Sequence, residues 1–555
     1  MKHFPALSIL FLFISCNAEF EVERKLPYDI HKRLVFSEHC KQLVISSNQD
    51  GYFKPLVISE TNSENPVTIP IKYAWNANAY PQSISCDCQS ISIIVENVKT
   101  NGFQLILYNQ TTQKAKLLTD KIDEDGGSSM FCPSNKILGY LASHKPFLYL
   151  VEEDKSTPIN SPPGVDFKNL NWSVNGKYLF LEDYSGDIWR YDVSTKIFKI
   201  LWESNSNTYT IDRLVTPSAE DEEVFYFVSD HESEFNQIYK YSTQKGIERF
   251  VMSSFDKYLL KRPIHENNFY YRVSVNGRYF IQKHVENNLL NLNPTRGVVY
   301  DYITGQDSVE YILDAQPDSA VEIHRRKKRR VVTLTKQSAL TDAPIPEVIF
   351  NKEGIHHLIF RPKGKCLGWL IWLHGGPYEQ VSMRYNPYIA NLVNEGWSII
   401  AINYPGSTGI GNQYESRDNG NLLSVQIKTI RRDLNDLMAK FHFQRYGIIG
   451  ISYGSILANE FAHSFGSEIT SIVEISGINT KVYPSALPSL LIFGKYDYML
   501  RNELRLRMID EEVTNKSVQF LTIENEGHSI SQNKNQSLIL SKIASFLRQN
   551  DFGKK

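Results

Sequence analysis

The sequence predicts two domains of different class, an all-β domain followed by an α/β domain. Three observations predict this. The chain has 555 residues, which is too many for one ordinary domain. Its first part carries short strand-like segments separated by turns, and near residue 335 this pattern changes to buried strands that alternate with helices. The 31 Tyr and 29 Phe favour a large content of β-structure.

Composition and charge exclude several classes of protein. The apolar content of 42% and the charged content of 22% are typical of a globular chain. A net charge of −1 provides no overall field that would attract nucleic acid, so we expect no nucleic-acid partner. Neither a C-x-x-C nor an H-E-x-x-H spacing occurs, and we therefore expect no metal and no other cofactor.

The N-terminus has the pattern of a targeting segment. Lys2-His3 precedes an apolar stretch, Phe4 to Ile14, of signal-peptide length that is too short to span a bilayer. Phe13-Ile14-Ser15-Cys16 is similar to a bacterial lipobox, in which Cys16 would carry the lipid. An ordinary cleavage site and an uncleaved start are the alternatives. We expect residues 1–18 to be a signal, and the protein to be exported to the bacterial cell envelope or periplasm, with possible membrane attachment through this lipid.

The remaining cysteines carry no decisive pattern. They are Cys40, Cys86, Cys88, Cys132 and Cys366. Export would permit disulfides among them, but their spacing predicts no pairing.

Residues 19–340 are predicted to form a β-propeller. The clearest unit, Leu170 to Trp202, has a Trp-Ser-x-x-Gly turn followed by strand-like segments that are separated by turns. Aromatic and aliphatic residues recur along each of these segments. Partial copies recur about 40 to 60 residues apart, which is the period of propeller blades. Seven blades would fill the segment, with six or eight as alternatives. One or two β-sandwiches are the other architecture that such strands can build.

Residues 341–555 are predicted to be an α/β domain, preceded by a proline-bearing linker at 335–350. Apolar runs predict strands at Cys366–His374, Trp397–Tyr404, Tyr446–Ile449, Ile469–Ser476, Ser489–Gly494 and Val518–Ile523. Helical character is found at Ser424–Phe441, Ser455–Phe465 and Ser537–Gln549. This alternation predicts a parallel sheet with helices on both faces.

Gly450-Ile451-Ser452-Tyr453-Gly454 fits a nucleophile elbow, the sharp turn that exposes a reactive serine between a strand and a helix. The two glycines would let strand and helix pack closely around a strained residue. The N-terminus of the helix would favour negative charge that develops nearby. An ordinary strand-to-helix turn is the alternative. We predict Ser452 to be a nucleophile.

Asp497 and His528 are the predicted acid and base. Each follows a predicted strand, and catalytic groups of open α/β sheets lie beyond the carboxyl ends of strands. The chain order Ser452, Asp497, His528 is that of α/β-hydrolases. His463 falls within a predicted helix, which leaves His528 as the base. The imidazole would take the proton of the weakly nucleophilic hydroxyl, and the carboxylate would fix its tautomer.

Three other carboxylates lie near these residues in the sequence. Glu474, near the end of a predicted strand, is the alternative acid. Glu524 and Glu526 precede His528, and we expect both to be solvated.

An oxyanion would need two hydrogen-bond donors. The N–H group of Tyr453, next to the nucleophile, can be one of them. The loop His374-Gly375-Gly376-Pro377, at the end of an earlier predicted strand, has the composition to supply the second, because glycines let main-chain amides approach a substrate closely. A plain glycine turn is the alternative.

Five segments together resemble the prolyl oligopeptidase family of serine peptidases, which includes acylaminoacyl and dipeptidyl peptidases. They are HGGPYEQ, GWSIIAINYPGSTGIGNQY, GISYGS, FGKYDYML and ENEGH. The resemblance implies a β-propeller followed by an α/β-hydrolase domain, a triad of Ser452, Asp497 and His528, and oxyanion donors at Tyr453 and Gly376. It also implies short peptide substrates, because the propeller restricts access to the site.

The chain departs from the family pattern in ways that bear on specificity. Pro405 replaces the usual arginine, Ser455 replaces a glycine, and Phe493 replaces a histidine. The path from Ile475 to Pro488 is short where members have a longer excursion that often lines the specificity pocket. The sequence therefore predicts an exported serine peptidase and does not predict which residues it prefers. An esterase with the same triad, or a propeller binding protein with a degenerate site, are the alternatives.

Overall fold

The computed structural model describes most of the chain. It covers residues 33–37, 39–49, 51–59, 66–70, 77–99, 102–119, 128–133, 136–204, 215–260, 264–285, 288–291, 296–304, 308–328, 330–335, 342–416, 421–478, 487–500 and 517–550. The predicted signal at 1–18 and the lipidation of Cys16 lie outside these residues. Among the described helices, none is both long enough and apolar enough to cross a bilayer.

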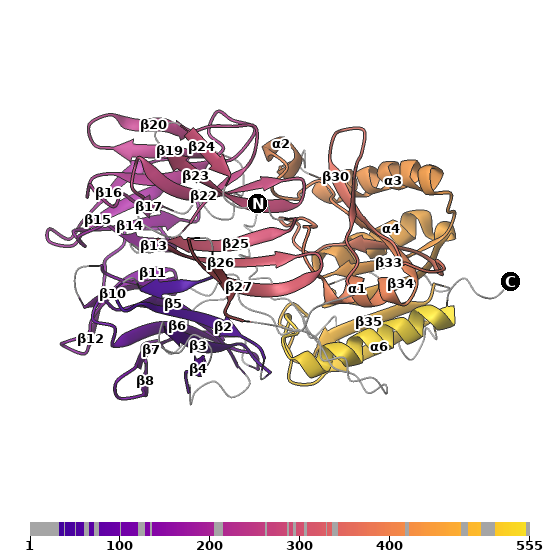
Figure 1. Ribbon diagram of the computed structural model, residues 1–555, viewed down its shortest axis with the longest axis horizontal. Helices are drawn as coiled ribbons and strands as arrows, with labels where there is room; N and C mark the ends of the chain where they lie inside the picture. The colour runs from indigo at the N-terminus through magenta and orange to yellow at the C-terminus, as the bar shows by residue number, and fades with distance from the viewer. Residues whose placement is uncertain are drawn as a thin grey trace.

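The first domain is a β-propeller (Figure 1). Its described residues form five four-stranded antiparallel sheets and one eight-stranded sheet, in which a single parallel bridge from β23 to β25 joins two further groups of four. This division gives seven groups of four strands, the blade number that the sequence favours. The groups are β1 Val35–Ser37, β2 Gln42–Ser47, β3 Lys54–Ser59, β4 Val67–Thr68; β5 Ala77–Ile84, β6 Ser90–Asn97, β7 Gly102–Asn109, β8 Lys114–Leu117; β9 Ser129–Phe131, β10 Ile137–Ala142, β11 Lys145–Leu150, β12 Lys155–Pro158; and β13 Phe167–Trp172, β14 Tyr178–Asp183, β15 Ile188–Asp192, β16 Ile197–Trp202. The last three are β17 Thr216–Pro217, β18 Phe225–Ser229, β19 Gln237–Ser242, β20 Gly246–Val251; β21 Lys257–Leu259, β22 Asn268–Val275, β23 Arg278–Val285, β24 Asn288–Asn291; and β25 Val298–Thr304, β26 Val309–Gln316, β27 Ser319–Lys327, β28 Arg330–Thr333.

The blades are held together by apolar clusters that form between neighbours. Val44 of the first blade packs with Ile93 of the second, and Phe180 of the fourth packs with Phe225 of the fifth. Leu43 of the first blade shares a cluster with Leu313 of the last, so the blades close into a ring. Each sheet therefore buries both of its faces, which accounts for the near-continuous apolar character of the inner strands.

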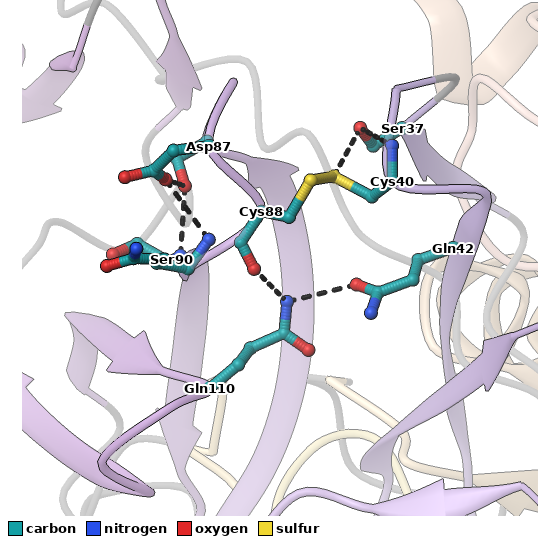
Figure 2. Close-up of a disulfide and its surroundings, with 9 residues drawn as sticks. Ser37, Cys40, Gln42, Asp87, Cys88, Ser90 and Gln110 are labelled. Carbon is teal, nitrogen blue, oxygen red and sulfur yellow. Dashed lines mark hydrogen bonds between the residues drawn. A yellow bond between two sulfur atoms is a disulfide. The ribbon is translucent and has the colours of Figure 1, made fainter.

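A disulfide links the first two blades (Figure 2). It joins Cys40, before β2, to Cys88, before β6, across 48 positions of sequence. The Gln110 amide donates both to the Cys88 carbonyl, at 2.8 Å, and to the side chain of Gln42, at 3.0 Å, beside this bond. A cross-link of this span stabilises a fold by on the order of 4 kcal/mol through the restricted unfolded chain.

The second domain is an α/β-hydrolase fold. Its eight-stranded sheet has the order β29-β30-β32-β31-β33-β34-β35-β36, parallel from β32 onward. The strands are β29 Glu347–Phe350, β30 His356–Phe360, β31 Gly368–Leu373, β32 Trp397–Ile402, β33 Tyr446–Ile451, β34 Ile469–Ile475, β35 Ser489–Gly494 and β36 Val518–Ile523. The helices are α1 Pro387–Asn394, α2 Asn412–Glu415, α3 Leu422–Phe441, α4 Tyr453–Phe465 and α6 Asn533–Asn550, with a 3₁₀ turn at Gly466–Glu468.

Helices cover both faces of this sheet, as the alternation of strand and helix predicts. Leu392 of α1 and Ile543 of α6 pack on one face. Leu434 of α3 and Leu457 of α4 pack on the other. Because the central strands are parallel, their carboxyl ends emerge at one edge of the sheet, where the connecting loops collect.

The predicted linker at 335–350 is wrong in its last four residues. Glu347–Phe350 forms β29, which pairs antiparallel with β30 at the edge of the sheet. Ile349 is buried against the face that carries α3 and α4, whereas Phe350 is largely exposed. The strand has only four residues and directly follows Pro344 and Pro346, which is why the sequence does not separate it from the linker.

The propeller and the hydrolase domain lie side by side and share main-chain hydrogen bonds (Figure 1). The Asn412 N–H donates to the Glu234 carbonyl at 2.7 Å, and the Met383 N–H donates to the Gly277 carbonyl at 2.7 Å. The Asn412 amide also donates to the Ser233 carbonyl at 3.1 Å. The later blades thus dock on the hydrolase loops that follow β31 and β32.

Candidate active site

Ser452 occupies a tight turn between β33 and α4. Its backbone has φ 48° and ψ −114°, a conformation that L-residues adopt only under constraint. A Cβ on Gly450 would lie 2.4 Å from the carbonyl oxygen of Gly454, and a Cβ on Gly454 would lie 2.3 Å from the carbonyl oxygen of Leu373. Both flanking positions must therefore be glycine, which explains the spacing of the motif.

The structure brings Ser452, His528 and Asp497 together. The Ser452 Oγ lies 2.9 Å from His528 Nε2. On the opposite side of the ring, His528 Nδ1 lies 3.0 Å from both carboxylate oxygens of Asp497. A carboxylate only accepts, so Nδ1 carries the proton and Nε2 is left to accept from the serine hydroxyl.

The three side chains are shielded from solvent. The exposed fractions are 2% for Ser452, 0% for Asp497 and 8% for His528. The Met499 N–H donates to Asp497 Oδ1 at 3.0 Å, and the Ser476 hydroxyl donates to the His528 carbonyl at 2.6 Å. Because the carboxylate and the histidine main chain are both held in place, the imidazole has one preferred orientation.

The two predicted oxyanion donors lie at equivalent positions beyond the ends of two adjacent strands. Leu373 of β31 pairs with Gly450 of β33 in parallel register, and Gly376 and Tyr453 each lie three residues further on. Gly376 has φ 126°, and a Cβ there would lie 2.6 Å from the N atom of Tyr378. Tyr453 is the first residue of α4, where N–H groups have no intrahelical acceptor.

His374, at the start of the oxyanion loop, is a fixed neutral ring. Its Nδ1 donates to the Gly375 carbonyl at 2.6 Å, and its Nε2 lies 2.9 Å from the Ser407 hydroxyl. Burial lowers the pKa of His374 to about 4. The Tyr404 ring stacks on His374, and its hydroxyl donates to the His374 carbonyl at 2.6 Å. Asn403 adds a further bond to this loop, accepting from the Val381 N–H at 2.7 Å.

These supporting residues are missing from the sequence prediction. Asn403, Tyr404 and Ser407 all belong to the segment NYPGSTG, which the sequence marks only as a resemblance. Ser476 gives no sequence signal, because a serine after a strand is common in any turn.

Among the three neighbouring carboxylates, the prediction for Glu526 is wrong. Glu474 is fully buried in β34, and its carboxylate lies beside Gly477, whereas Asp497 contacts His528. Glu524 is exposed and pairs with Lys495, as expected for a solvated residue. Glu526, also expected in solvent, is instead fully buried.

The Glu526 carboxylate organises the segment that follows His528. It accepts from the Ser531 N–H at 3.0 Å, the Gln532 N–H at 2.9 Å and the Asn535 side chain at 2.7 Å. Burial, the largest influence, raises the pKa of Glu526 to about 7. The acidic character of the local sequence concealed this role, because the donors lie further along the chain.

Comparisons with known proteins agree with this fold. Residues 368–505 match the alpha/beta hydrolase fold family. Acylamino-acid-releasing enzyme 1 of Oryza sativa subsp. japonica is 27% identical over 90 residues, which are 16% of this chain and 12% of that protein. The aligned segment thus spans about an eighth of the length of this curated relative.

Two solved peptidase structures share nearly the whole architecture. A structure from a study of two prolyl endopeptidases superposes with a TM-score of 0.76 at 12% identity, covering 94% of this chain and 89% of the other. A puromycin-hydrolyzing peptidase of Mycobacterium tuberculosis superposes with a TM-score of 0.73 at 13% identity, covering 99% and 96%. These neighbours are prolyl oligopeptidase family peptidases, so the resemblance predicted from the sequence is confirmed at the level of the fold.

Replacing Gly454 by alanine is expected to destabilise the protein by about 3 kcal/mol, because the added methyl group meets the main chain of β31 instead of a movable side chain. Urea unfolding at neutral pH measures the change. Gly466→Ala, at the other end of α4, is the matched control. Its φ is −58° and its Cβ meets no atom within 4 Å. Equal stability of the two variants would contradict the close contact at the elbow.

Glu526 gives the stability of the fold a defined pH dependence. Its pKa is about 7 in the folded protein, against 4.5 for an exposed glutamate. Between these values the folded protein binds more protons than the unfolded chain. The stabilisation from the neutral carboxyl is therefore complete below pH 4.5 and is lost as the pH rises to 7.

Glu526→Gln removes this titration. We expect the free energy of unfolding of the wild type, relative to the variant, to fall by about 2 to 3 kcal/mol between pH 5 and pH 8. Denaturant titrations of both proteins at several pH values measure the difference. A difference in unfolding free energy that stays constant, or one that grows with pH, would show that the pKa of Glu526 is not raised in the folded protein.

Proposed function

We propose that this chain, which has the fold of the prolyl oligopeptidase peptidases, is a serine peptidase that cleaves short peptides through an acyl-enzyme on Ser452. The observation that carries the proposal is the continuous set of contacts from the Asp497 carboxylate through His528 to the Ser452 hydroxyl. The hydroxyl lies on a strained turn at a helix N-terminus and makes no capping bond, so it is available for chemistry.

In the proposed mechanism the Ser452 oxygen attacks the scissile carbonyl carbon while His528 Nε2 accepts the hydroxyl proton. Asp497 stabilises the resulting imidazolium. The N–H groups of Gly376 and Tyr453 bind the oxyanion of the tetrahedral intermediate. The C–N bond then breaks, and the leaving amine takes the proton from His528. Water attacks the ester by the same route, and the acid product leaves with Ser452 restored.

Two features support short peptides as substrates. The triad is almost completely buried, and the propeller docks on the loops that surround it. A folded protein chain could not reach the hydroxyl of Ser452, a residue with an exposed fraction of 2%. The relatives are named for releasing acylamino acids, for prolyl endopeptidase activity and for puromycin hydrolysis, and amide cleavage is the chemistry that we transfer to this chain.

We also propose that the protein is exported, with a lipid on Cys16 as the means of attachment. The disulfide between Cys40 and Cys88 supports export, because such bonds persist in oxidising compartments. In protein purified from a bacterial membrane fraction, intact mass analysis should find a chain that begins at a diacylated Cys16. A mature chain without lipid would replace the lipoprotein assignment with an ordinary signal, and an intact N-terminus would contradict export.

The catalytic proposal is tested with a fluorophosphonate probe, which labels activated serines. The wild type should be labelled, and both Ser452→Ala and His528→Ala should lose at least about 10³-fold in labelling rate and in peptide hydrolysis. Hydrolysis of short peptide amides and of matched acyl esters separates a peptidase from an esterase. A folded wild type that takes no label would favour the binding-protein alternative.

A further inference from the structure

The loop that carries His528 is held from two sides. Within the hydrolase domain, the Ser476 hydroxyl and the Glu526 carboxylate bind it. The opposite side contacts the propeller, through the turn between β2 and β3 of the first blade and the turn after β6 of the second. We call residues 524–531 the base loop.

Two side chains of the first blade bind the two ends of the base loop. The Tyr52 hydroxyl donates to the carbonyl oxygen of Asn525 at 2.5 Å. The Asn48 amide donates to the carbonyl oxygen of Ser531 at 2.9 Å. These carbonyls lie three residues before and three residues after His528. The first blade therefore holds the base loop on both sides of the imidazole.

The chemistry of both donors suits a permanent contact. Burial raises the pKa of Tyr52 above its usual value, so its hydroxyl keeps its proton at neutral pH. Asn48 is fully buried, and its amide carries no titratable proton. Asn525 has φ 59°, a left-handed conformation that asparagine adopts more readily than most residues. The hydrogen bond from Tyr52 to its carbonyl therefore meets a defined turn of the base loop.

The second blade approaches the same loop. Val98 packs against Gly527, with its Cγ1 3.5 Å from the position of a Cβ on that glycine. Lys99 lies over the ring of Tyr496, at 5.9 Å, in the loop that carries the acid. Burial raises the pKa of the Glu96 carboxyl, which accepts from the Asn78 amide and lies close enough to His528 for an electrostatic interaction.

From these contacts we propose that Tyr52 and Asn48 are positioning residues for the base, and that the propeller completes the active site of the hydrolase domain. The inference rests on the proposed function, since it assigns the two residues to a reaction that His528 performs. Their role is to keep the imidazole aligned with Ser452, and neither residue needs to touch a substrate. A donor lost at either end of the loop increases the freedom of the ring and lowers the rate of the chemical step.

The test compares two pairs of variants. Tyr52→Phe and Asn48→Ala each remove one bond to the base loop. Tyr300→Phe and Asn412→Ala are matched controls, because each removes the same kind of group from a cross-domain bond elsewhere, the first to Arg384 and the second to Ser233. All four loosen the interface to a similar degree, but only the first two affect the base loop.

We expect Tyr52→Phe and Asn48→Ala each to lower the rate of fluorophosphonate labelling and kcat about fivefold, with KM nearly unchanged and the melting temperature within the range of the controls. The control variants should label at the wild-type rate. In proton NMR spectra, the low-field resonance of the His528 Nδ1 proton should broaden in the first pair alone. This signal reports the alignment of the ring, which a general loss of stability at the propeller would not affect.

The possible results distinguish the role of the propeller from the catalytic role of Ser452. Test variants that label at the wild-type rate, or controls that slow as much as the test variants, would overturn the proposal while leaving the catalytic role of Ser452 intact. A wild type that takes no label would instead overturn the proposed function. If Asn48→Ala does not fold, Tyr52→Phe, which removes only a hydroxyl group, decides alone.

Discussion

The site depends on one close approach of main chain to main chain, between the turn that carries Ser452 and the end of β31. Parallel pairing of β31 with β33 places Leu373 beside Gly450, and Gly454 then lies against the Leu373 carbonyl with no room for a Cβ. This contact makes Ser452 adopt a left-handed backbone. It also places the first turn of α4 beside the loop His374–Pro377, so that the proposed nucleophile and the proposed oxyanion donors depend on a single packing constraint.

Sequence reasoning predicted most of the sheet because its central strands are buried on both faces. Such strands are continuous apolar runs, and Ser489–Gly494 and Val518–Ile523 have the bounds that the sequence predicts. Ser452, Asp497 and His528 were selected because each follows one of these runs, and the structure brings the three side chains together. The edge strand Glu347–Phe350 was missed, since it has only four residues and directly follows a proline-bearing segment.

The parts of the site that escaped sequence analysis are those that depend on distant residues. The ENEGH segment reads as a polar turn, yet Glu526 is buried because donors at Ser531 and Asn535 satisfy its carboxylate. The contact of Tyr52 with Asn525 spans 473 positions, and nothing near either residue indicates it. The pairing of Cys40 with Cys88 is equally non-local, because it reflects the neighbouring positions of two blades.

The departures from the family pattern lie at positions where main-chain groups or apolar surfaces make the contacts. Pro405 in place of arginine still offers its carbonyl, which accepts from the Gln426 amide at 2.7 Å. Ser455 in place of glycine adds a hydroxyl that donates to the Ser452 carbonyl at 2.5 Å and strengthens the turn. Phe493 in place of histidine packs with Leu491 and Leu500. A fold specified by backbone contacts tolerates such exchanges, which is why a chain with 12% identity to a solved peptidase retains the same arrangement of both domains.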